Sequence, residues 1–124
     1  MPATTLNLPA DHEAPAQARG GLTRFLAPEN LAPELLENAA LLTTELVTNS
    51  VRHSALGASQ FIELHCDLDD RRLLVRVTDA GGPFPLPDPD DDVGGWGLLL
   101  VAEISDRWAV HRNVPNSVWF ELDR

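Results

Sequence analysis

Between Pro33 and about His53 the chain contains no glycine and no further proline. Apolar residues recur along this segment at helical spacing, at Leu35, Ala39, Leu42 and Leu46. Proline is well placed at the first helical position, because the N–H that it lacks would have no intrahelical partner there. The pattern predicts one long helix over 33–53, and Gly57 marks the exit from it.

The rest of the chain divides into short strands and two further helices. Alternating apolar and polar residues predict strands at 4–8, 61–67, 73–78, 107–111 and 117–122. Helices are expected from Asp11, as the N-cap, to about Leu26, and from about Trp96 to Ile104. This order indicates an α+β fold, a two-layer α/β sandwich with a mixed, mostly antiparallel sheet and helices on one face. The 124 residues contain no repeat and no domain boundary, so residues 1–124 are expected to form one domain.

Composition narrows the kinds of partner. Nine basic and nineteen acidic residues give a formal charge of −10, and a surface this acidic repels nucleic acid and anionic lipid. The N-terminal residues lack the basic and apolar segments of a signal peptide, and no apolar run is long enough for a membrane span. The single cysteine, Cys66, excludes an internal disulfide and is typical of a buried apolar position. We therefore expect a soluble, cytoplasmic protein.

A first polar cluster lies on the long helix. Glu45, Asn49 and His53 recur every four residues, so they share one helix face. A carboxamide oxygen suits a hard cation such as Mg²⁺, and a carboxylate can act as a general base. The alternative interpretation is a polar stripe that faces solvent.

Two glycine-containing clusters follow. Asp79 ends a strand and is followed by Gly81, where a ligand could approach the backbone closely. Gly95 and Gly97 open the last helix, where free N–H groups can bind phosphate. Between them, residues 82–94 form a long irregular segment rich in Pro, Gly and Asp. Each signal alone is as consistent with a turn or a hinge, but their order is specific.

Four stretches carry this combination: LLTTELVTNSVRHS, VRVTDAGGPFP, GGWGLLLVAEISDRWAV and NSVWFEL. Over nearly its whole length the chain resembles the GHKL ATPase superfamily, and within it the anti-sigma-factor serine/threonine kinases and their actinobacterial-type relatives. The resemblance implies the Bergerat ATP-binding fold, with ATP and Mg²⁺ as ligands. It also implies an activity, phosphorylation of a serine or threonine on an anti-sigma-factor antagonist, and a second partner, a sigma factor.

The resemblance also implies roles for single residues. Asn49 would coordinate Mg²⁺, Glu45 would be the base that activates the substrate hydroxyl, and His53 would line the phosphate side. Asp79 would accept a hydrogen bond from the adenine amine, with Gly81 allowing the base to approach.

The remaining implied positions lie later in the chain. Gly95 and Gly97 would begin the helix under the phosphates, and residues 82–94 would form the lid. Ser117 would support the adenine contact through its hydroxyl. Related kinases often dimerise, and the oligomeric state of this chain stays open.

Two departures from the family pattern support an alternative function. Trp96 stands where close relatives often have arginine, and the segment 82–94 has four aspartates and no basic residue. An acidic lid opposes the charge neutralisation on which phosphoryl transfer depends. The alternative is a catalytically weak or inactive module of the same fold that sequesters a protein partner.

Overall fold

The computed structural model describes residues 2–53, 61–79, 95–111 and 116–124. Five strands and three α-helices are formed by these residues: β1 (Ala3–Pro9), α1 (Ala14–Leu26), α2 (Pro33–His53), β2 (Phe61–Leu68), β3 (Arg72–Asp79), α3 (Gly95–Ile104), β4 (Arg107–His111) and β5 (Asn116–Asp123). A short 3₁₀ helix, Ala27–Glu29, follows α1. Every element expected from the sequence is confirmed, and the bounds differ by at most a few residues.

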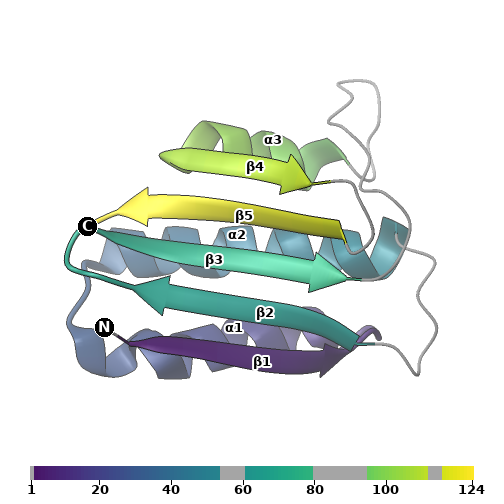
Figure 1. Ribbon diagram of the computed structural model, residues 1–124, viewed down its shortest axis with the longest axis horizontal. Coiled ribbons are helices and arrows are strands. Elements are labelled where there is room, and N and C mark those ends of the chain that lie inside the picture. Colours follow the sequence, from purple (N-terminus) through teal and green to yellow (C-terminus); the bar gives the residue numbers. More distant parts are fainter. Residues whose placement is uncertain (1, 54–60, 80–94, 112–115) are drawn as a thin grey trace.

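The five strands form one sheet in the order β1-β2-β3-β5-β4 (Figure 1). All four pairings are antiparallel. The expected α+β sandwich is therefore confirmed, but the sheet is antiparallel where a mixed one was expected. β2 and β3, and likewise β4 and β5, are consecutive in the chain, whereas α1 and α2 intervene between β1 and β2, and α3 and β4 intervene between β3 and β5.

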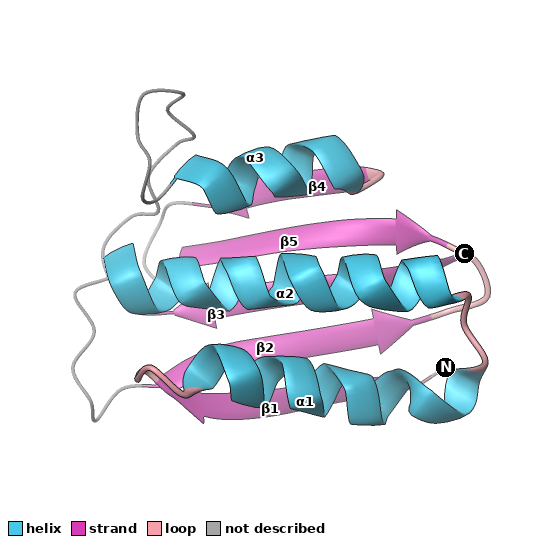
Figure 2. Ribbon diagram, turned by 180° about the vertical axis from the view of Figure 1, so that it is seen from behind, coloured by secondary structure: helices cyan, strands magenta, loops and turns pink. Residues whose placement is uncertain are grey.

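The helices cover one face of the sheet, and the core lies between the two layers (Figure 2). Alternate residues of the central strands point into it and are fully buried, among them Leu64, Val75, Val77 and Phe120. Cys66 belongs to this set, and burial raises the pKa of its thiol to about 12. In the described part of the chain, no helix has the length and apolar character that crossing a membrane requires.

The start of α1 differs from expectation. The helix begins at Ala14 with Glu13 as its N-cap residue, and no side chain caps it. Asp11 lies two residues too early for that role, and its Oδ1 accepts a hydrogen bond of 2.9 Å from the Glu13 N–H instead. Asp11 therefore shapes the turn that leads into the helix.

Later in α1, Gly21 brings the helix close to the edge strand. A Cβ atom at Gly21 would lie 2.3 Å from Cδ1 of Leu6, so a larger residue here would force the Leu6 side chain or the helix to shift.

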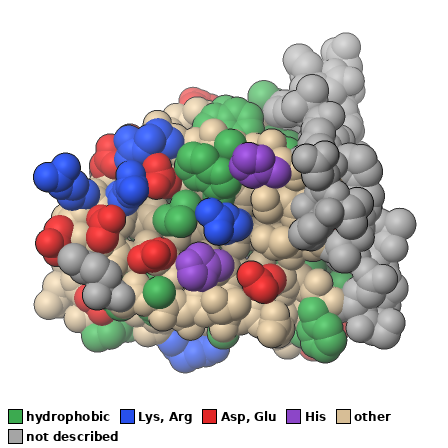
Figure 3. Space-filling view, viewed as in Figure 1, with side chains coloured by type: hydrophobic (Ala, Val, Ile, Leu, Met, Phe, Trp, Pro, Cys, Tyr) green, Lys and Arg blue, Asp and Glu red, His purple; other side chains and the backbone are tan. Residues whose placement is uncertain are grey.

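The other face of the sheet carries polar and half-buried side chains (Figure 3). At one end of this face the Glu121 carboxylate lies 3.1 Å from Nε of Arg72 and 2.6 Å from Nε of Arg107. Towards the other end, the Trp119 indole donates to Nε2 of His111 over 3.4 Å. The ion pairs join β3 and β4 through β5, and thereby fix the short edge strand β4.

Candidate functional site

Three elements bring the expected site residues to one end of the molecule. The C-terminal end of α2, the end of β3 and the first turn of α3 lie together there, at the right of Figure 1. Because α2 packs against both β3 and α3, the sheet and the helix layer fix their relative positions. The segments that connect these elements lie outside the described residues.

Helix α2 contributes Glu45 and Asn49. Glu45 is half-buried, whereas Asn49 is only 4% exposed. The Nδ2 atom of Asn49 is buried and has no hydrogen-bond partner among the described residues. A buried polar atom without a partner costs about 1–3 kcal/mol, and a half turn of the amide exchanges nitrogen for oxygen at this position. A ligand that satisfies this amide would remove the cost.

His53 and three glycines can be placed only in part. His53 ends α2, and nothing is described of its side chain. Gly95 and Gly97 lie in the first turn of α3, where the backbone N–H groups have no intrahelical acceptor. Gly81 and the expected lid, residues 82–94, lie outside the described residues.

Asp79 ends β3 with its side chain on the helix side of the sheet. It is 2% exposed, and its Oδ1 accepts a hydrogen bond of 3.3 Å from Nδ2 of Asn116. The two residues are direct partners in the pairing of β3 with β5. A carboxylate has about four acceptor positions, so it can bind Asn116 and the amine of a base together.

Ser117 is not brought to this site. It pairs with Thr78, one position away from Asp79, and successive residues of a strand point to opposite faces. Its side chain therefore lies on the polar face of the sheet, and the side chain that contacts the Asp79 carboxylate is that of Asn116. The sequence indicates that Asn116 lies on the buried face, because it alternates at every second position with the apolar residues Val118, Phe120 and Leu122.

Comparison with known proteins identifies this arrangement. The family model described as a histidine kinase-like ATPase domain matches residues 8–122, nearly the whole chain. The chain belongs to this family. The resemblance found in its four sequence stretches is thereby confirmed, and the domain is a kinase-like member of an ATP-binding family.

Curated relatives of this ATPase domain include bacterial protein kinases. The serine-protein kinase RsbW of Listeria innocua is 29% identical over 119 residues, which cover 82% of this chain and 74% of the relative. RsbW of Listeria monocytogenes serovar 1/2a is 29% identical over 117 residues, with the same coverage of both chains.

Solved structures share the fold of this ATPase domain. The RsbU and RsbW domains of Rv1364c from Mycobacterium tuberculosis match with a TM-score of 0.75 and 18% identity; the match covers 100% of this chain and 32% of that structure. The domain therefore spans about a third of that chain. The histidine kinase domain of the Erythrobacter litoralis EL346 blue-light activated histidine kinase matches with a TM-score of 0.61 and 19% identity, covering 85% of this chain and 60% of the other.

The donor set of the site fits the ligands of the family. Asn49 offers a carboxamide for a hard cation, and Asp79 offers a fixed carboxylate for an amine. No three His, Cys, Asp or Glu side chains come together as metal ligands in the described ranges. A cation here would depend on Asn49, on a single acidic neighbour and on oxygens that the nucleotide itself brings.

Proposed function

We propose that this ATPase domain binds Mg-ATP and phosphorylates a serine or threonine of an anti-sigma-factor antagonist, and that it also binds a sigma factor. The observation that supports this most is the pair of buried polar side chains at one end of the molecule. Asp79 is oriented by Asn116, and the buried Nδ2 atom of Asn49 has no hydrogen-bond partner among the described residues. Buried polar side chains destabilise a packed core unless they are hydrogen-bonded, but they can hydrogen-bond a polar ligand.

Each candidate site residue has a distinct part in the proposed reaction. Asp79 accepts a hydrogen bond from the adenine amine, and Asn49 holds the cation that accompanies the phosphates. Glu45, one turn before Asn49 on α2, accepts the proton of the substrate hydroxyl. Gly95 and Gly97 leave the first N–H groups of α3 open to phosphate oxygens. Bound Mg-ATP supplies the phosphoryl group and most of the charge neutralisation.

Isothermal calorimetry with Mg-ATP tests the nucleotide site. We expect micromolar binding by the wild-type chain and a loss of about tenfold or more in Asp79→Asn, which replaces the charged acceptor of the adenine amine by a neutral amide. Asn49→Ala should bind ATP equally well with and without Mg²⁺. Circular dichroism of both variants separates a lost ligand contact from a lost fold. Wild-type affinity in Asp79→Asn would contradict the adenine contact.

Phosphotransfer is a separate question. With γ-labelled ATP and a cognate antagonist, Glu45→Gln should lose label transfer by at least about 100-fold, the usual contribution of a positioned base, while its ATP affinity stays unchanged. Glu37→Gln, an exposed change of the same kind two turns earlier on α2, is the matched control. Equal transfer by Glu45→Gln and the wild type would remove Glu45 from the catalytic role.

A second candidate function rests on the charge of the segment 82–94. Its four aspartates and its lack of lysine or arginine favour a module that binds nucleotide weakly and acts by sequestering a protein. No ATP binding at millimolar concentration, together with capture of a sigma factor, would support this function. Asn49 and Glu45 would then be remnants of an active site.

A further inference from the structure

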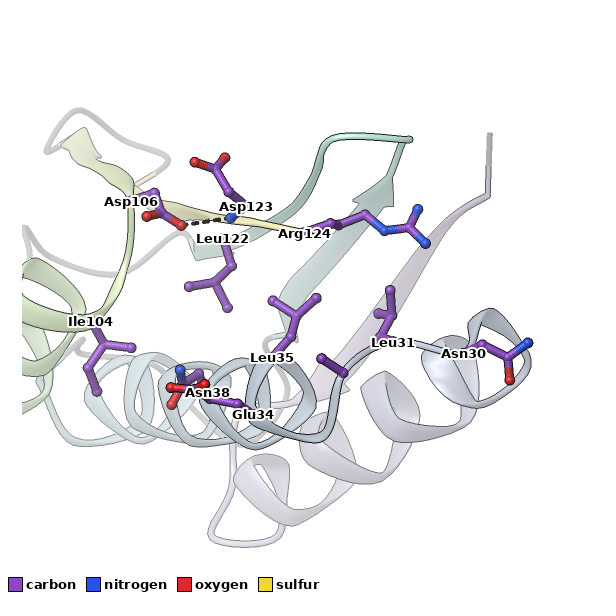
Figure 4. A pocket seen from close by; sticks show the side chains of 11 residues that line it. Asn30, Leu31, Glu34, Leu35, Asn38, Ile104, Asp106, Leu122, Asp123 and Arg124 are labelled. Carbon is purple, nitrogen blue, oxygen red and sulfur yellow. Dashed lines mark hydrogen bonds between the residues drawn. The ribbon is translucent and has the colours of Figure 1, made fainter.

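A cavity of about 450 Å³ lies at the end of the molecule opposite Asp79 (Figure 4). Its walls come from the first turns of α2 with the residues before them, from the end of α3 with the residues after it, and from the end of β5. Along α2, Asn38 at the edge of this cavity and Asn49 of the expected nucleotide site are 11 residues apart, about 16 Å at 1.5 Å per residue. It is therefore independent of the function proposed above.

The floor of this cavity is apolar. Leu35 and Leu122 are 9% and 3% exposed, and Leu31 and Ile104 are half-buried and pack against the core. In Figure 4 the Leu35 and Leu122 side chains point toward one another from α2 and β5. Such a floor gains free energy when an aliphatic side chain displaces water from it.

The rim of the cavity is acidic. The carboxylates of Glu34 and Asp106 are exposed, and both residues line the cavity. Asp123 also lines it, but successive residues of β5 point to opposite faces, and its carboxylate pairs with Arg107 on the polar face of the sheet. The only basic residue in the lining is Arg124, and its Nη1 donates to the carbonyl oxygen of Asp69 over 2.8 Å, in the turn after β2. The rim thus has two carboxylates against one guanidinium, in a chain whose net charge is already −10.

One of the two rim carboxylates, that of Asp106, also has a structural bond, which holds it in place. Oδ2 of Asp106 accepts a hydrogen bond of 2.7 Å from the Asp123 N–H, and the Asp123 carboxylate pairs with Arg107. Glu34 lies in the first turn of α2, where a negative charge is favourable in any helix. Helix stabilisation explains Glu34 alone, and does not explain why a second carboxylate, that of Asp106, lies beside the same apolar floor.

We propose that this cavity docks a segment of a protein partner in which a lysine or arginine lies beside an aliphatic residue. The long stem of a basic side chain covers apolar surface while its charged end remains at a polar rim, and here that rim has the complementary charge. The volume falls within the range of specific ligand sites and exceeds that of a surface irregularity.

Titration of the ¹⁵N-labelled chain with short blocked peptides tests this proposal. The probe is an alternating Arg-Leu hexapeptide, and Glu-Leu and Arg-Ser hexapeptides are the comparison probes. We expect the Arg-Leu peptide to shift amide signals around the cavity, between Leu31 and Asn38 and between Ile104 and Asp106. Both comparison peptides should bind at least about tenfold more weakly, because each lacks one of the two features.

Variants of the rim separate specific docking from general attraction. Glu34→Gln with Asp106→Asn should weaken the Arg-Leu peptide at least about tenfold, and the asparagine retains an acceptor for the Asp123 N–H. Glu37→Gln with Glu103→Gln removes two exposed charges near the same helices outside the cavity, and should leave the affinity within about twofold.

Three results would overturn the proposal. The first is equal weakening by both double variants, and the second is equal binding of the Glu-Leu peptide. The third is a shift of the cavity signals with the concentration of the chain alone, because the occupant would then be a second copy of the chain. None of these measurements uses ATP, so failure here leaves the nucleotide proposal untouched.

Discussion

Asp79 and Asn116 are the residues in which chemistry and strand register meet most closely. In the proposed site, the Asp79 carboxylate can accept a hydrogen bond from the adenine amine only if its orientation is fixed. A hydrogen bond of 3.3 Å from the Asn116 amide fixes this orientation. Sequence reasoning found Asp79 from its place at a strand end. Sequence reasoning did not pair Asn116 with Asp79, because the register of β5 against β3 becomes visible only when both strands are placed together.

Asn116→Ala should lower the affinity for ATP by about tenfold or more, since one hydrogen bond to a charged group contributes about 1.5–3 kcal/mol. Ser117→Ala removes a hydroxyl from the neighbouring residue on the other face of the sheet, and should leave affinity unchanged. Calorimetry on both variants decides between the two residues. A larger loss in Ser117→Ala would mean that the sequence-based assignment holds and the register argument fails.

At the scale of the elements, periodicity predicted every strand and helix, because the residues of each buried face recur at the spacing of that structure. What it could not predict was how closely elements approach. The contact between α1 and β1 depends on Gly21, which lacks the Cβ that would meet Leu6. The sequence shows two adjacent glycines that look equally unfavourable in a helix, and only packing distinguishes them.

Gly20→Ala should stabilise the protein by about 1 kcal/mol, because alanine is the better helix former and the nearest atom to a new Cβ, Arg24 Nη1, is 3.4 Å away. Gly21→Ala should instead be neutral or destabilising, because the same gain is opposed by a clash with Leu6. Urea unfolding measures both. In the Gly21→Ala background, Leu6→Ala should cost less than in the wild type; equal stabilisation by both alanines would contradict the close approach.

The turn between β2 and β3 depends on Asp69. Its Oδ1 accepts hydrogen bonds from the N–H groups of Arg71 and Arg72, at 2.7 and 2.8 Å. These two bonds, the Arg71 bond first, lower the pKa of the Asp69 carboxyl below its usual value. A carboxyl with a lowered folded pKa contributes stability above its unfolded pKa, near 3.9, and loses that contribution as pH falls through the folded value.

Asp69→Asn should therefore be less stable than the wild type at pH 7, and the difference should shrink as pH falls below 4. Urea unfolding at pH 7 and pH 3 provides the comparison. Asp70→Asn removes the same charge from the next residue, which accepts no backbone hydrogen bond in the described part of the chain, and should show a smaller difference at pH 7. A difference for Asp69→Asn that is independent of pH would exclude the titration of Asp69 as its cause.

At the scale of the whole molecule, a net charge of −10 on 124 residues sets a field that opposes any anionic ligand. Composition predicted this field, which argues against nucleic acid as a partner. Composition could not predict that the acidic residues would include two carboxylates, those of Glu34 and Asp106, beside an apolar cavity away from Asp79. That arrangement needs the ends of α2, α3 and β5 to meet, and they are distant in the chain.

Raising NaCl from 10 to 150 mM should increase the affinity for Mg-ATP. The Debye length shortens from about 30 Å to about 8 Å, and the repulsion between the acidic surface and the phosphates is then screened. Calorimetry at both salt concentrations, with free Mg²⁺ held constant, measures the change. A fall in affinity would show that local cationic contacts dominate the field, with Arg52, exposed near the end of α2, as the first candidate for substitution.

The burial of Cys66 has a practical consequence for all of these measurements. Thiol reagents attack the thiolate, and a thiol that is inaccessible within the sheet can react only in molecules that have opened. Because the chain has a single cysteine, its alkylation rate counts opening events directly. A ligand that binds only the closed form slows this rate by the factor 1 + [L]/Kd, about 100-fold at a hundredfold excess over Kd. The rate of this one covalent reaction therefore reports both the stability of the fold and the occupancy of its ligand site, in a chain that carries no engineered cysteine.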